Sequence, residues 1–227
     1  TAPCASVDAM NSLQGIGMTS QRTRARMVER LREKGIRHDA VLQAMAAVPR
    51  HIFVEEALAS RAYEDTALPL GMGQTISQPF IVARMIELLL NGRAGLGKTL
   101  EIGAGCGYQA AVLAQLSKDV FAIERIGPLL DKAKANMRTI QQFNVRLKHA
   151  DGHLGLPEAS PFDSIIVAAA GIAIPVELLR QLAPGGRMIL PLGVQEQQLC
   201  LVEHTPQGYV ETRLDPVRFV PLLAGTQ

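Results

Sequence analysis

The chain has 227 residues, long enough for one substantial core. It carries 23 Lys and Arg against 21 Asp and Glu, and this near balance argues against a nucleic-acid partner, which usually meets a clear basic excess. No apolar stretch approaches membrane-spanning length, and the three widely separated cysteines fit neither a disulfide framework nor a zinc site. We therefore expect a cytoplasmic protein with no nucleic-acid, membrane or metal partner.

The N-terminal part is expected to be helical after a short leader. Residues 1–18 are small and polar without a period, which predicts a poorly ordered leader, and we expect residues 19–227 to form a single domain. Apolar residues at helical spacing predict helices over 20–34 and from 39 to just before Pro49. Residues 60–79 are turn-rich and irregular, as functional loops often are. Pro79 suits the first turn of a further helix that ends near residue 90.

The chain is organised around residues 98–107, KTLEIGAGCG. An apolar run ends in an acid and breaks into Gly103, Gly105 and Gly107, and a helical pattern follows over 108–116, which predicts strand, tight turn and helix. Glycines let a ligand approach the backbone closely, and the start of a helix offers free N–H groups. Tyr108 occupies the position where a dinucleotide motif needs a small residue, so the spacing disfavours a pyrophosphate. Glu101 suits a cationic or amino-bearing ligand such as S-adenosylmethionine.

Strands and helices alternate through the rest of the core. A predicted strand over 119–123 ends at Glu124, where a carboxylate can accept both hydroxyl hydrogens of a ribose. Further strands at 144–149, 162–168 and 187–190, with helices at 128–138 and 175–182, predict a doubly wound, mostly parallel α/β sheet. The strand-like segments 198–203 and 209–218 predict an antiparallel C-terminal edge. We divide the domain into N-terminal helices and loop (19–94), cofactor-binding core (95–195) and C-terminal strands (196–227).

Seven segments, in order between residues 20 and 223, resemble the protein-L-isoaspartate O-methyltransferase family. The most specific are GQTISQP at 73–79 and VRFVPL at 217–222. The others are VPRHIFV at 48–54, LEIGAGCGYQ at 100–109, AIERI at 122–126, PFDSIIVAAA at 161–170 and LAPGGRMILPLG at 182–193. One departure is visible, because Ala150 stands where the family usually has a glycine before Asp-Gly.

The resemblance implies a Rossmann-like class I S-adenosylmethionine-dependent methyltransferase. Such an enzyme methylates the free carboxylate of L-isoaspartyl residues in damaged proteins and peptides, initiates their repair and releases S-adenosylhomocysteine. For the cofactor, the resemblance implies that Gly103, Gly105 and Gly107 shape the turn, that Glu124 holds the ribose, and that Asp151 and Gly152 lie against the adenine.

For the reaction, the resemblance implies that Thr75, Ile76 and Ser77 stand where the methyl donor meets the acceptor, with Ser77 as the catalytic residue. It also implies that Val220, Pro221 and Leu222 hold the backbone of the substrate.

The residues of the 60–79 segment suit a carboxylate acceptor. A carboxylate is already ionised at neutral pH, so no strong base is required, and the segment contains no histidine. We expect Ser77 to hydrogen-bond and position the substrate carboxylate. Taken alone, however, Ser77 could equally cap the helix that begins at Pro79. We expect Cys106 to be a tolerated small residue rather than a nucleophile, and Tyr63, Glu64 and Asp65 to line the loop or to stabilise a turn.

Other functions remain open from the residues alone. One is a methyltransferase for a small molecule or RNA, although residues 167–170, VAAA, offer no polar acceptor for the amine of a base. Another is a nicotinamide-dependent oxidoreductase, against which Tyr108 counts. A compact domain with an open peptide cleft leads us to expect a monomer.

Overall fold

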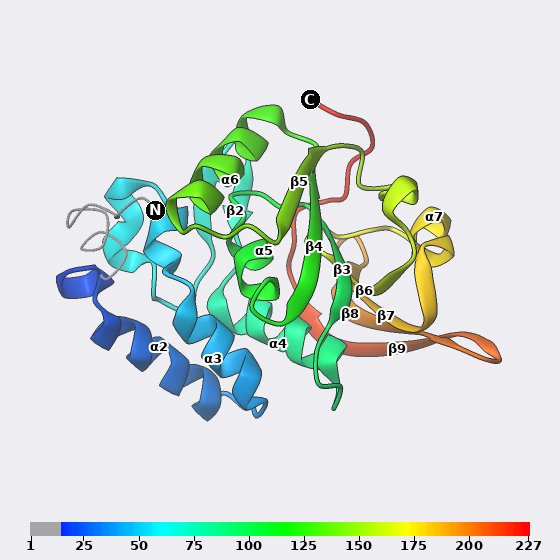
Figure 1. Ribbon diagram of the computed structural model, residues 1–227, viewed down its shortest axis with the longest axis horizontal. Coiled ribbons are helices and arrows are strands. Elements are labelled where there is room, and N and C mark those ends of the chain that lie inside the picture. The colour runs from blue at the N-terminus through cyan, green and yellow to red at the C-terminus, as the bar shows by residue number, and fades with distance from the viewer. Residues whose placement is uncertain (1–14) are drawn as a thin grey trace, which may run out of the picture.

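A seven-stranded sheet forms the centre of the molecule (Figure 1). The computed structural model describes residues 15–227. Residues 1–14 of the expected leader lie outside the described residues. Within the rest of the leader region, Gly17–Thr19 forms a short 3-10 helix, η1. The strand order is β5-β4-β3-β6-β7-β8-β9; the first five strands are parallel, and β8 and β9 are antiparallel to their neighbours. The doubly wound sheet with an antiparallel C-terminal edge is therefore confirmed. The strands are β3 (Gly97–Ile102), β4 (Ser117–Glu124), β5 (Val145–His149), β6 (Phe162–Val167), β7 (Leu182–Leu192), β8 (Gln197–Thr205) and β9 (Gly208–Val217).

The strand order reverses beside β3, and this reversal places the site. From β3 the chain winds outward to β4 and β5, then returns to β6 on the other side of β3. At the end of β3, Ile102 pairs with Ile123 of β4 and with Val167 of β6. Because ligands of open α/β sheets bind where the winding reverses, at the carboxyl ends of the strands, the glycine turn after β3 lies at the expected position.

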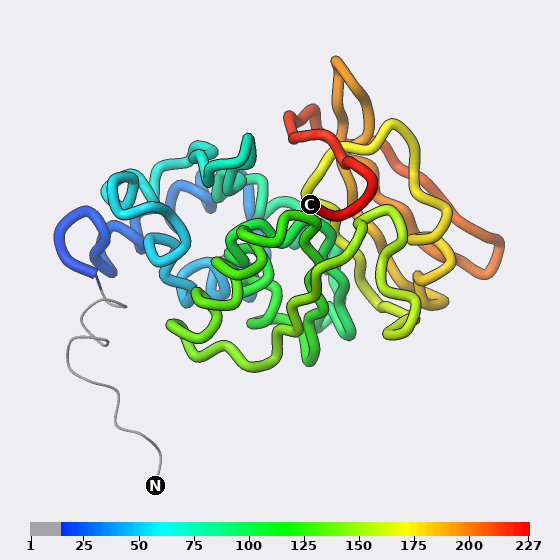
Figure 2. Tube along the Cα trace, turned by 90° about the horizontal axis from the view of Figure 1, so that it is seen from above, coloured from blue at the N-terminus to red at the C-terminus, as the bar shows by residue number. Residues whose placement is uncertain are grey.

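Helices cover the two faces of the sheet unequally (Figure 1). On one side lie α2 (Gln21–Glu33), α3 (Asp39–Ala47), α4 (Pro79–Leu90), α5 (Tyr108–Leu113) and α6 (Gly127–Thr139), and on the other lies the short α7 (Val176–Arg180). Successive residues of β6 enter different apolar clusters, Ile166 on the side of α4 and α5 and Ile165 on the side of α7. This burial on both faces explains the nearly continuous apolar run of β6. Figure 2 shows the N-terminal helices and the C-terminal strands at opposite ends of the molecule, with the glycine-turn region between them.

The N-terminal helices begin and end close to the predicted residues. Ser20 caps α2 by accepting a hydrogen bond from the backbone N–H of Thr23. Residues 60–79 were expected to be irregular, but they include an antiparallel hairpin of β1 (Leu68–Gly71) and β2 (Gln74–Ile76). Strands of three and four residues are too short to show an alternating pattern in the sequence, which is why this expectation was wrong. Three further 3-10 helices are η2 (Arg50–Phe53), η3 (Glu56–Arg61) and η4 (Pro157–Ala159).

Two predicted helices are shorter than expected. The helix after the glycine turn ends at Leu113 rather than 116, and α7 ends at Arg180 rather than 182. Strand β7 is longer than expected, because Leu182 already pairs with Phe162 and the Pro-Gly-Gly turn forms an irregularity within the strand. No helix among residues 15–227 has the length and apolar character needed to cross a membrane.

Candidate active site

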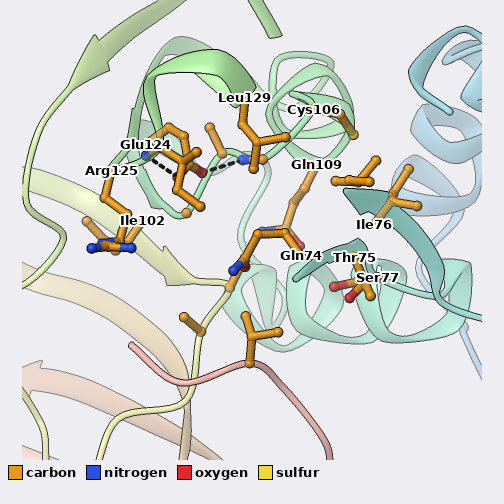
Figure 3. A pocket seen from close by; sticks show the side chains of 18 of the residues that line it. Gln74, Thr75, Ile76, Ser77, Ile102, Cys106, Gln109, Glu124, Arg125 and Leu129 are labelled. Atoms are coloured by element: carbon orange, nitrogen blue, oxygen red, sulfur yellow. Dashed lines mark hydrogen bonds between the residues drawn. The ribbon is translucent and has the colours of Figure 1, made fainter. Parts of the chain in front are cut away.

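A pocket opens at the carboxyl ends of β3 and β4, and distant parts of the chain line it (Figure 3). They include the β1–β2 hairpin with the residues after it, the glycine turn, the end of β4 with the residues after it, and the C-terminal segment 220–223. The pocket encloses about 860 Å³ of space, open solvent at its mouth included, which is within the range of small-molecule sites. It brings together every predicted site residue except Gly107 and Asp151: Thr75, Ile76, Ser77, Glu101, Gly103, Gly105, Glu124, Gly152, Val220, Pro221 and Leu222.

The glycine turn needs its glycines for two different reasons. Gly105 lies in the left-handed region, with φ of 55°, and its N–H donates to Glu124 Oε2 at 2.8 Å. Gly107 has φ of 88° and precedes α5; a Cβ there would lie 2.8 Å from Met137 Cε. Gly107 therefore allows the turn to pack against α6, whereas Gly103 and Gly105 face the pocket.

Glu124 is held rigidly at the end of β4. Its side chain is 5% exposed, Oε1 accepts from the N–H of Ile126 at 2.9 Å, and Oε2 accepts from Gly105 (Figure 3). Each carboxylate oxygen can accept a second hydrogen bond. The fixed carboxylate can therefore receive hydroxyl hydrogens from a ligand in the pocket without rearranging.

Glu101, at the end of β3, has one satisfied oxygen and one unsatisfied oxygen. Its side chain is fully buried; Oε1 accepts from Gln109 Nε2 at 3.0 Å, and Oε2 has no hydrogen-bond partner among the described residues. Burial, and secondarily the charge of Glu124, raise the pKa of Glu101 well above its ordinary value. An unpaired buried carboxylate oxygen is costly, and an amino or cationic group of a ligand would supply the missing donor. The residues thus fit S-adenosylmethionine. Gln109 was missed in the sequence, where no local signal links it to Glu101.

Ser77 does not cap the helix that follows it. The N-cap residue of α4 is Gln78, which makes no side-chain cap. The backbone N–H of Phe80 instead donates to Asp65 Oδ1 at 2.8 Å, and Asp65 also pairs with Lys34. The half-buried Ser77 hydroxyl makes no hydrogen bond to another described residue. The helix-cap alternative is therefore wrong, and this hydroxyl remains available within the pocket.

Asp151 and Gly152 are neighbours in the chain but differ in position. Gly152 lines the pocket so closely that a Cβ would lie 2.6 Å from Ile102 Cγ2 and 3.2 Å from Leu222 Cδ1. The carboxylate of Asp151 lies outside the pocket and accepts from the N–H groups of His153 at 2.8 Å and Gly225 at 2.6 Å. Burial opposes its ionisation, but these N–H groups, that of Gly225 foremost, lower the pKa of Asp151 overall.

The C-terminal segment crosses the pocket and is bound at both ends. The Val220 carbonyl accepts from Ala170 N at 2.7 Å, and Leu222 N donates to the Ala170 carbonyl at 2.8 Å. Farther on, Arg125 Nε donates to the Gly225 carbonyl at 3.1 Å, and the Arg125 carbonyl accepts from the backbone of Gln227 at 2.7 Å. Arg125 also lines the pocket, a position that the sequence pattern did not reveal.

The remaining candidate residues have structural roles. Burial raises the pKa of Cys106 to about 11, so its thiol is protonated at neutral pH and unsuited to nucleophilic attack. The Tyr63 hydroxyl accepts from Arg24 Nε of α2 at 3.1 Å, and Glu64 pairs with Arg61. Neither of these residues nor Asp65 lines the pocket. Within residues 15–227 no group of three or more His, Cys, Asp or Glu could hold a metal ion.

The family model and the sequence relatives agree on one family. The family model described as protein-L-isoaspartate(D-aspartate) O-methyltransferase matches residues 22–227. A protein-L-isoaspartate O-methyltransferase of Dechloromonas aromatica is 83% identical over 95% of this chain and 100% of its own length. Another, from Methylobacillus flagellatus, is 62% identical over 95% and 98% of the two chains.

Two solved structures resemble the fold over most of the chain. One, described as a protein-L-isoaspartate O-methyltransferase from Plasmodium falciparum in complex with S-adenosyl-L-homocysteine, has a TM-score of 0.78 and 26% identity and covers 88% of this chain and 98% of its own. The other, a protein-L-isoaspartate O-methyltransferase, has a TM-score of 0.79 and 29% identity over 87% of this chain and 65% of its own.

Proposed function

Because the chain belongs to the protein-L-isoaspartate(D-aspartate) O-methyltransferase family, we propose that the pocket described above is its active site. The enzyme transfers a methyl group from S-adenosyl-L-methionine to the free carboxylate of L-isoaspartyl residues in damaged proteins, which initiates their repair. One observation carries the assignment of the pocket: a single cavity joins the glycine turn and its two acids to the free hydroxyl of Ser77. The family match does not favour the oxidoreductase alternative.

The donor side of the pocket is assigned to the glycine turn and its acids. S-adenosylmethionine, when bound, supplies an electrophilic methyl group on a sulfonium. Glu124 would accept the ribose hydroxyls, since its two oxygens are already oriented by backbone N–H groups. Glu101 would receive the amino group on its unpaired Oε2. Gly152 would let the adenine approach the backbone, and Asp151 would act indirectly by holding this turn to Gly225.

The acceptor side is assigned to Thr75, Ile76, Ser77 and the C-terminal segment. An isoaspartyl carboxylate is ionised at neutral pH, and none of the described residues that line the pocket is a histidine or lysine. The Ser77 hydroxyl would donate a hydrogen bond to one carboxylate oxygen and leave the other free to attack. Val220, Pro221 and Leu222 would hold the peptide backbone across the pocket. The residues therefore act by positioning the acceptor and removing water from it rather than by taking a proton.

A paired peptide assay tests this function. Two peptides that differ only in an isoaspartyl or an aspartyl residue are incubated with the enzyme and methyl-labelled S-adenosylmethionine. We expect base-labile methyl ester on the isoaspartyl peptide and none on the aspartyl peptide. Equal labelling of both peptides would contradict the substrate assignment.

We also propose that the chain acts as a monomer on peptides and not on nucleic acid. All parts of the pocket come from one chain, and the overall charge is close to neutral, +2 with histidines neutral. Light scattering after gel filtration should give the mass of one chain, and a dimer mass would contradict the proposal. A cytoplasmic location stays a prediction from the sequence, which cell fractionation would test.

A further inference from the structure

The active-site pocket continues into a second hollow through shared walls. Thr75, Ser77, Ala168 and Val220 line both cavities. The far wall of the second hollow consists of residues 216–219, and these lead into a third hollow, which shares Pro216, Val217 and Arg218 with the second. We call the second and third hollows together the flanking groove. It begins beside Ser77 and runs outward over the ends of β8 and β9.

Hydrogen bonds and an ion pair hold the wall of the flanking groove that residues 216–219 form. The side-chain amide of Gln197 binds both backbone groups of Phe219: Nε2 donates to its carbonyl at 3.1 Å, and Oε1 accepts from its N–H at 2.6 Å. Asp215 pairs with Arg84 of α4 at 3.0 Å, so its charge is compensated on the helix side. The segment between Asp215 and Val220 is therefore held from β8, α4 and, through Ala170, the end of β6.

The flanking groove carries positive charge next to the acceptor site. Of the described residues that line the second hollow, one carries a charge, and it is Arg218. The third hollow adds Arg213 and one acid, Glu196. Both arginines are exposed, and neither forms an ion pair with another residue in 15–227. Two guanidinium groups against one carboxylate leave a net positive groove that begins at Ser77.

We propose that the flanking groove binds the polypeptide next to the isoaspartyl residue, and that Arg218, with Arg213, selects substrates that carry Asp or Glu on that side. The inference rests on the proposed function, because it takes Ser77 as the place of the acceptor carboxylate. A chain that leaves this point through the second hollow passes Arg218 and then Arg213. A guanidinium binds a carboxylate through two parallel hydrogen bonds and repels a lysine in the same place.

Peptides that differ only in flanking charge test the proposal. Isoaspartyl peptides are made with two Glu, two neutral residues or two Lys, placed on either the amino or the carboxyl side, and kcat/KM is measured for each. On one side we expect the Glu peptide to exceed its Lys counterpart roughly fivefold, as exposed charge pairs allow, with a ratio that falls as salt is added. Arg218→Ala and Arg213→Ala should each lower this ratio, and the double variant should bring it close to one. Arg218→Lys should retain part of it.

A matched variant separates a specific effect from a general loss of charge. Arg138 is also exposed, forms no ion pair within the described residues and lies in the last turn of α6, outside the flanking groove, so Arg138→Ala should leave the ratio unchanged. Equal kcat/KM for Glu and Lys peptides on both sides would overturn the proposal, as would a preference that survives in the double variant. If no isoaspartyl peptide is methylated, whatever its flanking residues, the proposed function itself is refuted. If the peptides are methylated without a charge preference, the function stands and only the role of the flanking groove is refuted.

Discussion

Replacing Ser77 with alanine should lower catalysis without lowering stability. The Ser77 hydroxyl makes no hydrogen bond to another residue in 15–227, and Asp65 takes the capping role at α4. Its removal therefore breaks no hydrogen bond within the described fold, and the free energy of unfolding should stay within about 0.5 kcal/mol of wild type. A hydrogen bond from this hydroxyl to a charged acceptor is worth about 1.5–3 kcal/mol, which predicts a roughly 10- to 150-fold loss of kcat/KM for an isoaspartyl peptide.

Three measurements on the same preparation check this prediction. Peptide kinetics give kcat/KM, calorimetry gives the affinity for S-adenosylhomocysteine, and thermal unfolding gives Tm. We expect Ser77→Ala to change the first and to leave the other two close to wild type.

Asp65→Ala provides the matched control. It removes the hydrogen bond to Phe80 and the pair with Lys34, and loss of an N-cap costs about 0.5–2 kcal/mol. For a chain of this size that cost corresponds to a fall in Tm of roughly 1–8 °C. If Ser77→Ala lowers Tm as much as Asp65→Ala, or weakens product binding as much as it slows methylation, the positioning role of Ser77 is refuted.

Three further substitutions test the donor side. Glu124→Ala should weaken S-adenosylhomocysteine binding roughly 10- to 150-fold by calorimetry, because a hydrogen-bonded carboxylate is worth about 1.5–3 kcal/mol; unchanged affinity would exclude the ribose role. Burial raises the pKa of Glu101 well above 4.5. Above pH 4.5 the folded state therefore keeps a proton on Glu101 that the unfolded chain releases. The contribution of this proton to the free energy of unfolding is complete below pH 4.5 and is lost as the pH rises through the folded-state pKa. The Tm of the unliganded wild type should therefore fall more than that of Glu101→Gln as the pH is raised above 4.5, and parallel curves would contradict this. Gly152→Ala places a Cβ 2.6 Å from Ile102 and 3.2 Å from Leu222 and should destabilise the protein by about 1–3 kcal/mol in denaturant unfolding; full stability with full cofactor affinity would show that the turn can shift freely.

Local patterns were sufficient to predict the core of the fold. The strand, glycine turn and helix over 97–113 follow from an apolar run, glycines at alternate positions and an alanine-rich helix, all of which act within a few residues. The same holds for Glu124, whose distance from the glycines along the chain brings it to the same edge of a parallel sheet. These contacts were predictable because sheet geometry converts sequence spacing into spatial proximity.

Contacts between distant segments were not predictable in this way. The cap on α4 comes from Asp65, fifteen positions before Phe80, and so the serine next to the helix was an equally good candidate from the sequence. The carboxylate of Asp151, a residue that the resemblance assigns to the adenine, accepts a hydrogen bond from Gly225, 74 positions away. Arg125 binds the same C-terminal segment. No periodicity or turn signal couples such positions, since their proximity arises only when the C-terminal segment crosses the completed sheet.

The pocket retains two polar groups that the fold could have satisfied but does not. Gln109 binds one oxygen of Glu101 and leaves Oε2 unpaired, and Asp65 caps α4 and leaves the hydroxyl of Ser77 free. A buried carboxylate oxygen without a partner destabilises the folded state, so a ligand that supplies a donor recovers that free energy on binding. Because such a ligand binds the folded state alone, it should raise Tm in proportion to the logarithm of its concentration above Kd. Glu101→Gln replaces this carboxyl with a neutral amide, which binds an amino or cationic donor less strongly, so the same ligand should bind less tightly and raise Tm less at equal concentration.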